Sequence, residues 1–128
     1  MKLTLKLVVA GLALGFSASS MAADPIKIGV AGPFTGGSAP MGVSMRDGVK
    51  LAVAEINAKG GLLGRQIQLV ERDDEAKNER GVQIAQELIN KEKVVATVGY
   101  INTGVALASQ RFYQEAKIPV MNLSLIHI

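Results

Sequence analysis

The sequence has no cysteine, a single histidine and few aromatic residues. Without cysteine the chain forms no disulfide bond, even in an oxidising compartment that would permit one, and it lacks the thiol to which a bacterial lipoprotein attaches its lipid. The histidine, His127, lies next to the C-terminal residue, where we expect no catalytic or metal-binding role for it. These absences favour a protein without a lipid anchor, a metal or another cofactor.

An excess of charge is also missing. The chain has 14 Lys and Arg against 11 Asp and Glu, and 12 against 11 once Lys2 and Lys6 near the N-terminus are left out. No block of basic residues with interleaved aromatic side chains remains, although such a block is typical of a nucleic-acid-binding surface. We therefore expect no nucleic-acid partner.

An apolar run at residues 7–16 follows the two lysines and precedes a series of small residues. This order is typical of a secretory signal peptide, and the run is about half the roughly 20 residues that a transmembrane helix requires. Ser20 and Ala22 fit the small-x-small cleavage pattern. We predict that residues 1–22 are a cleaved signal peptide, with cleavage after Ala23 as the alternative, and that the mature protein is periplasmic.

Strand-like and helix-like segments alternate along the rest of the chain. The strand patterns cover residues 26–31, 66–71, 94–98 and 118–121, and the helical patterns cover residues 42–59, 79–91 and 103–116. The run at 94–98 is almost entirely apolar, as in a central parallel strand that is buried on both faces. Strict alternation with short links predicts an α/β fold, in which helices cover both faces of a parallel sheet.

Apolar residues at helical spacing predict which helix faces are buried. On the first helix the predicted inward residues are Met45, Val49, Ala52, Val53 and Ile56, and on the third they are Val105, Ala108, Phe112 and Ala116.

Several motifs in a fixed order resemble the N-terminal lobe of the branched-chain amino acid (Leu/Ile/Val-type) binding proteins. They are the glycine-rich segment 28–36, Asp47-Gly48, the helix end at 54–61, Asp73-Asp74, and the segment 98–104. No single motif carries the resemblance, because glycine-rich turns are common. The resemblance implies a type I periplasmic binding protein, whose two α/β lobes close around a small solute.

Proteins of this family are much longer than this chain. The resemblance therefore implies that residues 23–122 form part of the first lobe only. Residues 123–128 resemble a translated sequencing adaptor, and we expect them not to be native.

The family also implies a function and partners. We expect a monomeric solute-binding subunit of an ABC importer, which binds a branched-chain or related amino acid and delivers it to permease and ATPase subunits. A ligand-sensing domain of a receptor or an amide-responsive regulator is the alternative, because the same fold serves both outputs.

An enzyme that binds a nucleotide cofactor is a competing class. The glycines after the first strand do not have G-x-G-x-x-G spacing, and Pro33 stands where a helix should begin against a pyrophosphate. We therefore predict that the protein is not an enzyme.

Ligands of parallel α/β sheets bind beyond the carboxyl ends of the strands. The N-terminus of a helix suits a ligand carboxylate, because its N–H groups and dipole favour an anion. Asn102, Thr103 and Gly104 precede or begin the third helix, and the resemblance places Thr103 where the family contacts the ligand carboxylate. An N-cap role for Asn102 or Thr103 is the alternative.

Two further residues complete the predicted site. Tyr100 lies just before this segment, and Met41 stands where several members of the family have an aromatic residue over the ligand. Asp73 and Asp74 resemble a catalytic pair, but we interpret them as loop and capping residues, because no reacting group accompanies them.

Overall fold

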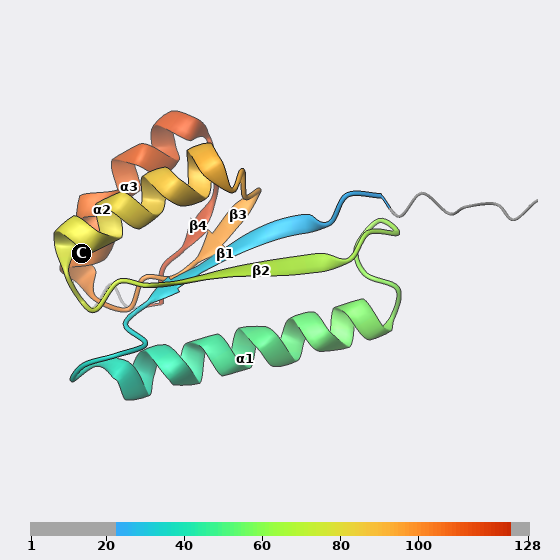
Figure 1. Ribbon diagram of the computed structural model, residues 1–128, viewed down its shortest axis with the longest axis horizontal. Coiled ribbons are helices and arrows are strands. Elements are labelled where there is room, and N and C mark those ends of the chain that lie inside the picture. The colour runs from blue at the N-terminus through green and yellow to red at the C-terminus, as the bar shows by residue number, and fades with distance from the viewer. Residues whose placement is uncertain (1–22, 124–128) are drawn as a thin grey trace, which may run out of the picture.

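The computed structural model of the protein describes residues 23–123. Within them four parallel strands form one sheet, with helices on both of its faces (Figure 1). The predicted signal peptide at 1–22 and residues 124–128 of the predicted adaptor tail lie outside the described residues. None of the helices between 23 and 123 is long and apolar enough to cross a membrane.

The elements alternate in the predicted order. The strands are β1 (Ile26–Gly32), β2 (Ile67–Asp73), β3 (Ala96–Val98) and β4 (Val120–Met121). The helices are α1 (Ala39–Ala58), α2 (Asn78–Gln86), the π-helical turn η1 (Glu87–Lys91) and α3 (Thr103–Ala116). The strands lie in the order β2-β1-β3-β4, so β3 is central, as its apolar run predicts.

Several boundaries differ from the sequence prediction, and two of these differences have a local cause. Helix α1 begins at Ala39 instead of residue 42, with Pro40 in its first turn, where proline's missing N–H has no intrahelical partner to lose. Strand β3 begins at Ala96 instead of residue 94. The N–H of Glu92 donates to the carbonyl of Glu87 at 3.0 Å and closes η1, and the N–H of Val94 donates back to the carbonyl of Leu88 at 3.1 Å instead of to a strand.

Helix α1 lies alone on one face of the sheet, and α2, η1 and α3 cover the other (Figure 1). The core on the second face is larger. Ile84 and Leu88, at 1% and 0% exposure, are among its buried residues, and burial of each such side chain contributes about 1.5–3 kcal/mol. The core under α1 centres on Val30, Met45 and Ile101.

The buried face of α3 is rotated from the predicted one. Val105 is buried as expected, but Ala108 and Phe112 are half-buried and Ala116 is exposed. The other buried residues are Ala106, Ser109 and Tyr113. Ser109 and Tyr113 are polar, so the spacing of apolar residues alone did not predict that this part of the helix surface is buried.

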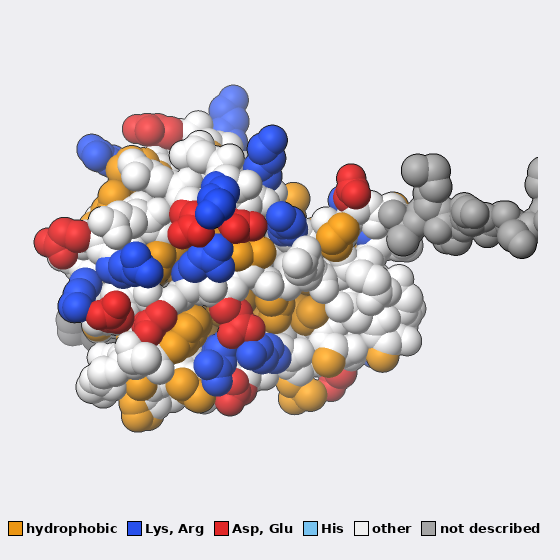
Figure 2. All heavy atoms as spheres, viewed as in Figure 1, with side chains coloured by type: hydrophobic (Ala, Val, Ile, Leu, Met, Phe, Trp, Pro, Cys, Tyr) orange, Lys and Arg blue, Asp and Glu red, His pale blue; other side chains and the backbone are white. Residues whose placement is uncertain are grey.

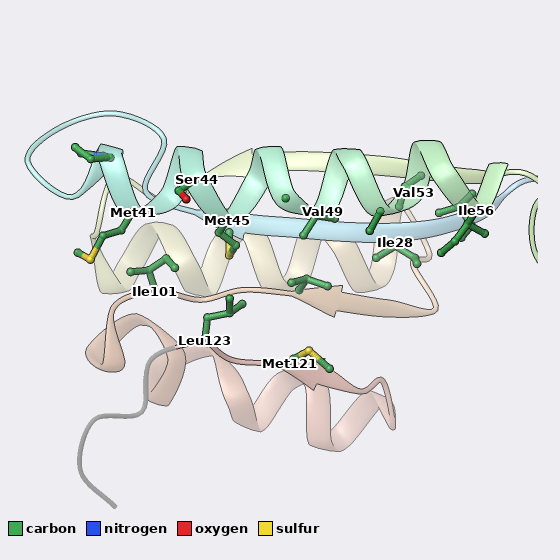
Figure 3. Close-up of a pocket in the computed structure, with 15 residues that line it drawn as sticks. Ile28, Met41, Ser44, Met45, Val49, Val53, Ile56, Ile101, Met121 and Leu123 are labelled. Atoms are coloured by element: carbon green, nitrogen blue, oxygen red, sulfur yellow. The ribbon is translucent and has the colours of Figure 1, made fainter. Parts of the chain in front are cut away.

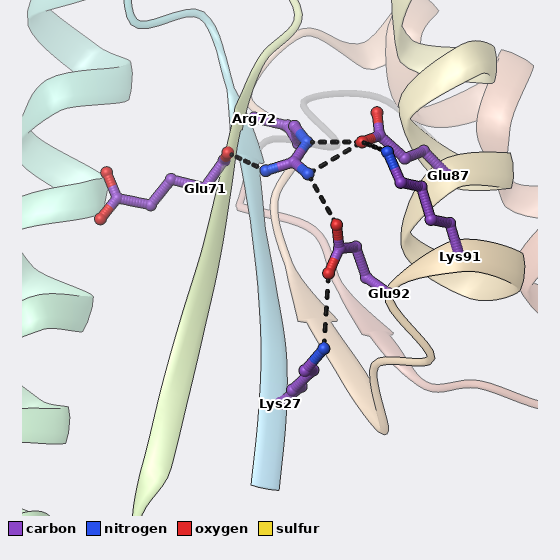
Figure 4. A network of polar contacts seen from close by, with 6 residues as sticks. All are labelled: Lys27, Glu71, Arg72, Glu87, Lys91 and Glu92. Carbon is purple, nitrogen blue, oxygen red and sulfur yellow. Dashed lines mark hydrogen bonds and ion pairs between the residues drawn. The ribbon is translucent and has the colours of Figure 1, made fainter. Parts of the chain in front are cut away.

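A network of charged side chains holds η1 against the sheet (Figure 4). Arg72 on β2 donates to Glu87 at 2.8 Å and to Glu92 at 3.0 Å, and Glu92 also pairs with Lys27 at 3.5 Å. The hydrogen bond with Glu87 is the main cause that raises the pKa of Arg72, and the same bond lowers the pKa of Glu87.

Positive and negative side chains are interspersed on the face seen in Figure 2.

Candidate functional site

The carboxyl ends of the strands meet at one edge of the sheet, beside the N-termini of all three α-helices (Figure 1). The segments at this edge are residues 33–38 after β1, 74–77 after β2 and 99–102 after β3. The structure therefore brings the predicted segment Asn102–Gly104 to the edge where parallel α/β sheets bind ligands.

Helix α3 begins at this edge with Asn102 as its N-cap residue. The carbonyl of Asn102 accepts a bond from the N–H of Ala106 at 3.0 Å, and the N–H groups of the first turn have no acceptor within the helix. They and the helix dipole favour a negatively charged group at this end.

The side chain of Asn102 does not cap the helix. It makes no capping hydrogen bond, and its Oδ1 is buried without a partner among the described residues. An N-cap side chain normally bonds to an N–H of the first turn. The backbone of Asn102 therefore fits the capping alternative, but its side chain does not.

Thr103 and Gly104 form the first turn of α3. Thr103 is half-buried and Gly104 is exposed. A side chain at position 104 would approach Asn78 at the start of α2, since a Cβ there would lie 3.0 Å from Asn78 Oδ1. Glycine keeps this narrow gap between the two helix N-termini free of a side chain.

Met41 lies in the first turn of α1, on the other face of the sheet, and is 58% exposed. It shares one end of an apolar groove with Ile101 and Leu123 (Figure 3). Because Ile101 directly precedes Asn102, the structure brings Met41 to the same edge as the α3 N-terminus.

The apolar groove between α1 and the sheet has a volume of about 1240 Å³. Ser44 supplies the one polar side chain among the described residues that line it. No charged side chain lines the groove among the described residues, so the charges of a zwitterion would have no oppositely charged partner and the groove does not suit an amino acid. The groove also explains why two of the residues predicted to be buried on α1, Ala52 and Ile56, are exposed: both line the groove.

The side chain of Tyr100 does not face the predicted site. It is 1% exposed, its hydroxyl shares a 3.0 Å hydrogen bond with the Tyr113 hydroxyl, and it donates to the carbonyl of Gly81 at 3.4 Å. Burial raises the pKa of both tyrosines. The expected ligand contact is therefore corrected: Tyr100 packs beneath α2 and α3 and supports the loop from the core.

Asn122 holds the same loop from the next strand. Its Oδ1 accepts a bond from the N–H of Tyr100 at 3.0 Å. This role was not predicted from the sequence, although an asparagine directly after a strand often bonds to a nearby backbone group.

The two adjacent aspartates bond to the loops as predicted, but neither caps a helix, because the N-cap residue of α2 is Lys77 and no side chain caps that helix. Asp73 accepts three hydrogen bonds, from the N–H groups of Phe34 and Glu75 and from the Thr35 hydroxyl. Asp74 is fully buried and accepts one from the N–H of Ala76 at 2.8 Å. Among residues 23–123 no cluster of three or more His, Cys, Asp or Glu side chains is arranged to hold a metal ion.

Comparison with known proteins decides the family. A sequence model of the periplasmic binding proteins matches residues 25–127. The chain belongs to the periplasmic binding protein family. This is a family of substrate-binding proteins of transporters and not of enzymes, which removes the nucleotide-dependent enzyme.

Relatives and solved structures agree with this assignment. The chain is 40% identical to Leu/Ile/Val-binding protein homolog 2 of Brucella abortus over 90 residues, which are 70% of this chain and 24% of that protein. The chain thus spans about a quarter of the length of this curated relative.

Two solved structures show the fold. The branched-chain amino acid transporter substrate-binding protein of Streptococcus pneumoniae, in complex with isoleucine, has a TM-score of 0.75 and 30% identity, over 80% of this chain and 30% of that chain. A solute-binding protein of an ABC transporter from R. palustris, in complex with benzoate, has a TM-score of 0.70 and 31% identity, over 77% of this chain and 27% of that chain. The fold of residues 23–123 is part of a type I periplasmic binding protein, as predicted.

Proposed function

We propose that the chain belongs to an exported solute-binding subunit of an ABC importer, and that the solute carries a carboxylate. The observation that supports this most directly is the N-terminus of α3, which lies at the carboxyl edge of the sheet, where its N–H groups and dipole favour an anion. Export would follow from the signal peptide predicted at residues 1–22.

In this proposal the N–H groups of the first α3 turn and the Thr103 hydroxyl donate to the ligand carboxylate. Gly104 lets the carboxylate approach the backbone, and Asn102 Oδ1 accepts a bond from a donor on the ligand or a bound water. Met41 offers an exposed, adaptable apolar surface beside them. The same carboxylate recognition suits a branched-chain amino acid and an aromatic acid, in keeping with the isoleucine and benzoate complexes of the two similar proteins.

The test measures the affinity of the complete receptor for L-leucine, L-isoleucine and benzoate by calorimetry. We expect Thr103→Ala to weaken binding about tenfold or more, since a hydrogen bond to a charged group contributes roughly 1.5–3 kcal/mol. Thr103→Ser keeps the hydroxyl and should bind nearly as the wild type does.

Ser44→Ala is the matched control, because it removes an exposed hydroxyl from α1. Unchanged affinity in a Thr103→Ala and Asn102→Ala double variant would show that the ligand binds elsewhere. Fusion of residues 1–23 to alkaline phosphatase, whose disulfide bonds form only after export, tests export, and an inactive fusion protein that stays in the cytoplasm would contradict it.

A further inference from the structure

One carboxylate joins two of the segments that form the edge of the site. Asp73, the last residue of β2, accepts the N–H of Phe34 and the N–H of Glu75, each at 2.9 Å, on Oδ1. Its Oδ2 accepts the Thr35 hydroxyl at 2.6 Å. An aspartate that only closed its own turn would bond to Glu75 alone, whereas two of these donors belong to the segment after β1.

The segment that donates these bonds is packed through Pro33, which is fully buried, while the residues after Phe34 have little packing of their own. Thr35, Gly36 and Gly37 are exposed, and a Cβ on either glycine would meet no atom within 4 Å. Phe34 is half-buried, with the Arg46 guanidinium 5.4 Å from the centre of its ring. The bonds to Asp73, together with the buried Pro33, are therefore a main restraint on the path from β1 to α1.

Asp73 remains charged in this setting. Partial burial acts to raise its pKa, but the hydrogen bonds from Thr35 and from the backbone of Glu75 and Phe34 outweigh it, and the pKa of Asp73 lies below its usual value. Hydrogen bonds to a charged acceptor are roughly twice as strong as those between neutral groups.

We propose that Asp73 is a positioning residue of the binding site: its carboxylate holds residues 33–38 against the end of β2 and so fixes the first turn of α1, where Met41 lies. The inference rests on the proposed function. The inference adds to the site a residue that contacts no ligand but sets the distance between Met41, in the first turn of α1, and the N-terminus of α3.

Amide hydrogen exchange on this chain tests the structural part without a ligand. The informative amides are those of Met41 and Gly42, which donate to the carbonyl of Ser38 and not to Asp73. We expect Asp73→Ala to speed the exchange of these two amides about tenfold and to leave the exchange rates of the amides in β3 and α3 unchanged. Asp73→Asn keeps an acceptor at Oδ1 and should restore most of the protection.

Asp47→Ala is the matched control, because Asp47 is an exposed aspartate that bonds, among the described residues, to its neighbour Arg46 and not to residues 33–38. Should Asp73→Ala destabilise the whole chain, Thr35→Val removes a single bond to the carboxylate and is expected to give a smaller effect of the same kind, about twofold to threefold. Unchanged protection at Met41 and Gly42 in these variants would overturn the proposal.

Binding by the complete receptor tests the functional part, with L-leucine and benzoate as probes well below the melting temperature. Asp73→Ala should weaken the affinity about tenfold, Asp73→Asn should recover most of it, and Asp47→Ala should leave it unchanged. A lower melting temperature with an unchanged Kd would show a purely structural role and overturn the proposal. If the wild type binds neither probe, the proposed function fails for these ligands, while exchange at Met41 still decides whether Asp73 positions α1.

Discussion

Two adjacent carboxyl groups at the end of β2 have pKa values displaced in opposite directions. Three donors surround Asp73 and its pKa falls, although partial burial opposes the change. The pKa of Asp74 rises, because burial disfavours its charge, one N–H compensates only in part, and the charge of Asp73 adds to the rise. Their environments, and not their residue type, decide which group is costly to ionise.

The raised pKa of Asp74 makes folding stability depend on pH. The folded state binds the carboxyl proton of Asp74 more tightly than the unfolded state does. The stabilisation that this group contributes is therefore largest at pH values below its pKa in the unfolded state. It is lost as the pH rises through the folded pKa. Asp73 has the opposite sign: its contribution is present at neutral pH and is lost as the pH falls through its lowered folded pKa.

We therefore predict that Asp74→Asn stabilises the chain at pH 7, by an amount on the order of 1 kcal/mol. The asparagine keeps an acceptor for the N–H of Ala76 and removes a buried charge whose Oδ2 has no partner among the described residues. Urea unfolding at several pH values measures the effect, which should shrink as the pH falls.

Asp24→Asn, at an exposed position, is the control and should change stability little at any pH. Lower stability of Asp74→Asn at pH 7 would mean that the ionised carboxylate has a partner beyond the described contacts.

Helices α2 and α3 pack closely because a glycine faces a valine across their interface. A Cβ at Gly81 in α2 would overlap Cγ1 of Val105 in α3 and lie 3.1 Å from the Ser109 hydroxyl. A glycine in a helix interior normally costs about 1 kcal/mol relative to alanine. Here the close approach of the helices reverses that preference.

We predict that Gly81→Ala destabilises the chain by about 1–3 kcal/mol, the range for overpacked cores. Thermal or urea unfolding measures the change. Gly48→Ala is the control, since a Cβ at that α1 position would meet no atom within 4 Å, and it should be neutral or stabilising. A Gly81→Ala and Val105→Ala double variant should lose less stability than the two single changes add up to, and strict additivity would exclude the contact.

The elements themselves were largely predictable, and the faces of the helices less so. Alternation of apolar runs and helical stripes predicted every strand and helix in order, because the two periods differ. The π-helical turn η1 was not predicted, since it depends on the bond from the N–H of Glu92 to the carbonyl of Glu87 and on the Arg72 network. Tyr113 and Ser109 have polar side chains, but both are buried in the packed structure, and they lie on the face of α3 that is turned toward the core.

At the scale of the whole molecule, the two faces of the sheet are covered unequally. Helices α2 and α3 close one face, while α1 leaves the apolar groove open on the other (Figure 1, Figure 3). Met121 on β4 is 68% exposed and Ile56 on α1 is 37% exposed. Exposed apolar area of this kind binds hydrophobic probes.

We predict that the isolated chain binds the dye ANS in this groove. Replacement of both Ile56 and Met121 by Lys should reduce the fluorescence at least twofold with little loss of stability, because neither side chain is buried. Leu107→Lys is the control, since Leu107 is 56% exposed on α3, outside the groove. An equal loss of fluorescence in this control would show that the dye binds elsewhere.

The sequence by itself determined the order of strands and helices, the parallel sheet and the family, because these depend on local periodicity and on motifs in a fixed order. It also brought Asn102, Thr103 and Gly104 to the edge of the sheet, since the carboxyl ends of parallel strands must meet there. Tertiary structure decided that Tyr100 points into the core, that Asp73 joins two loops and that one face of α1 stays open. Each of these depends on contacts between residues far apart in the chain, which local pattern does not encode.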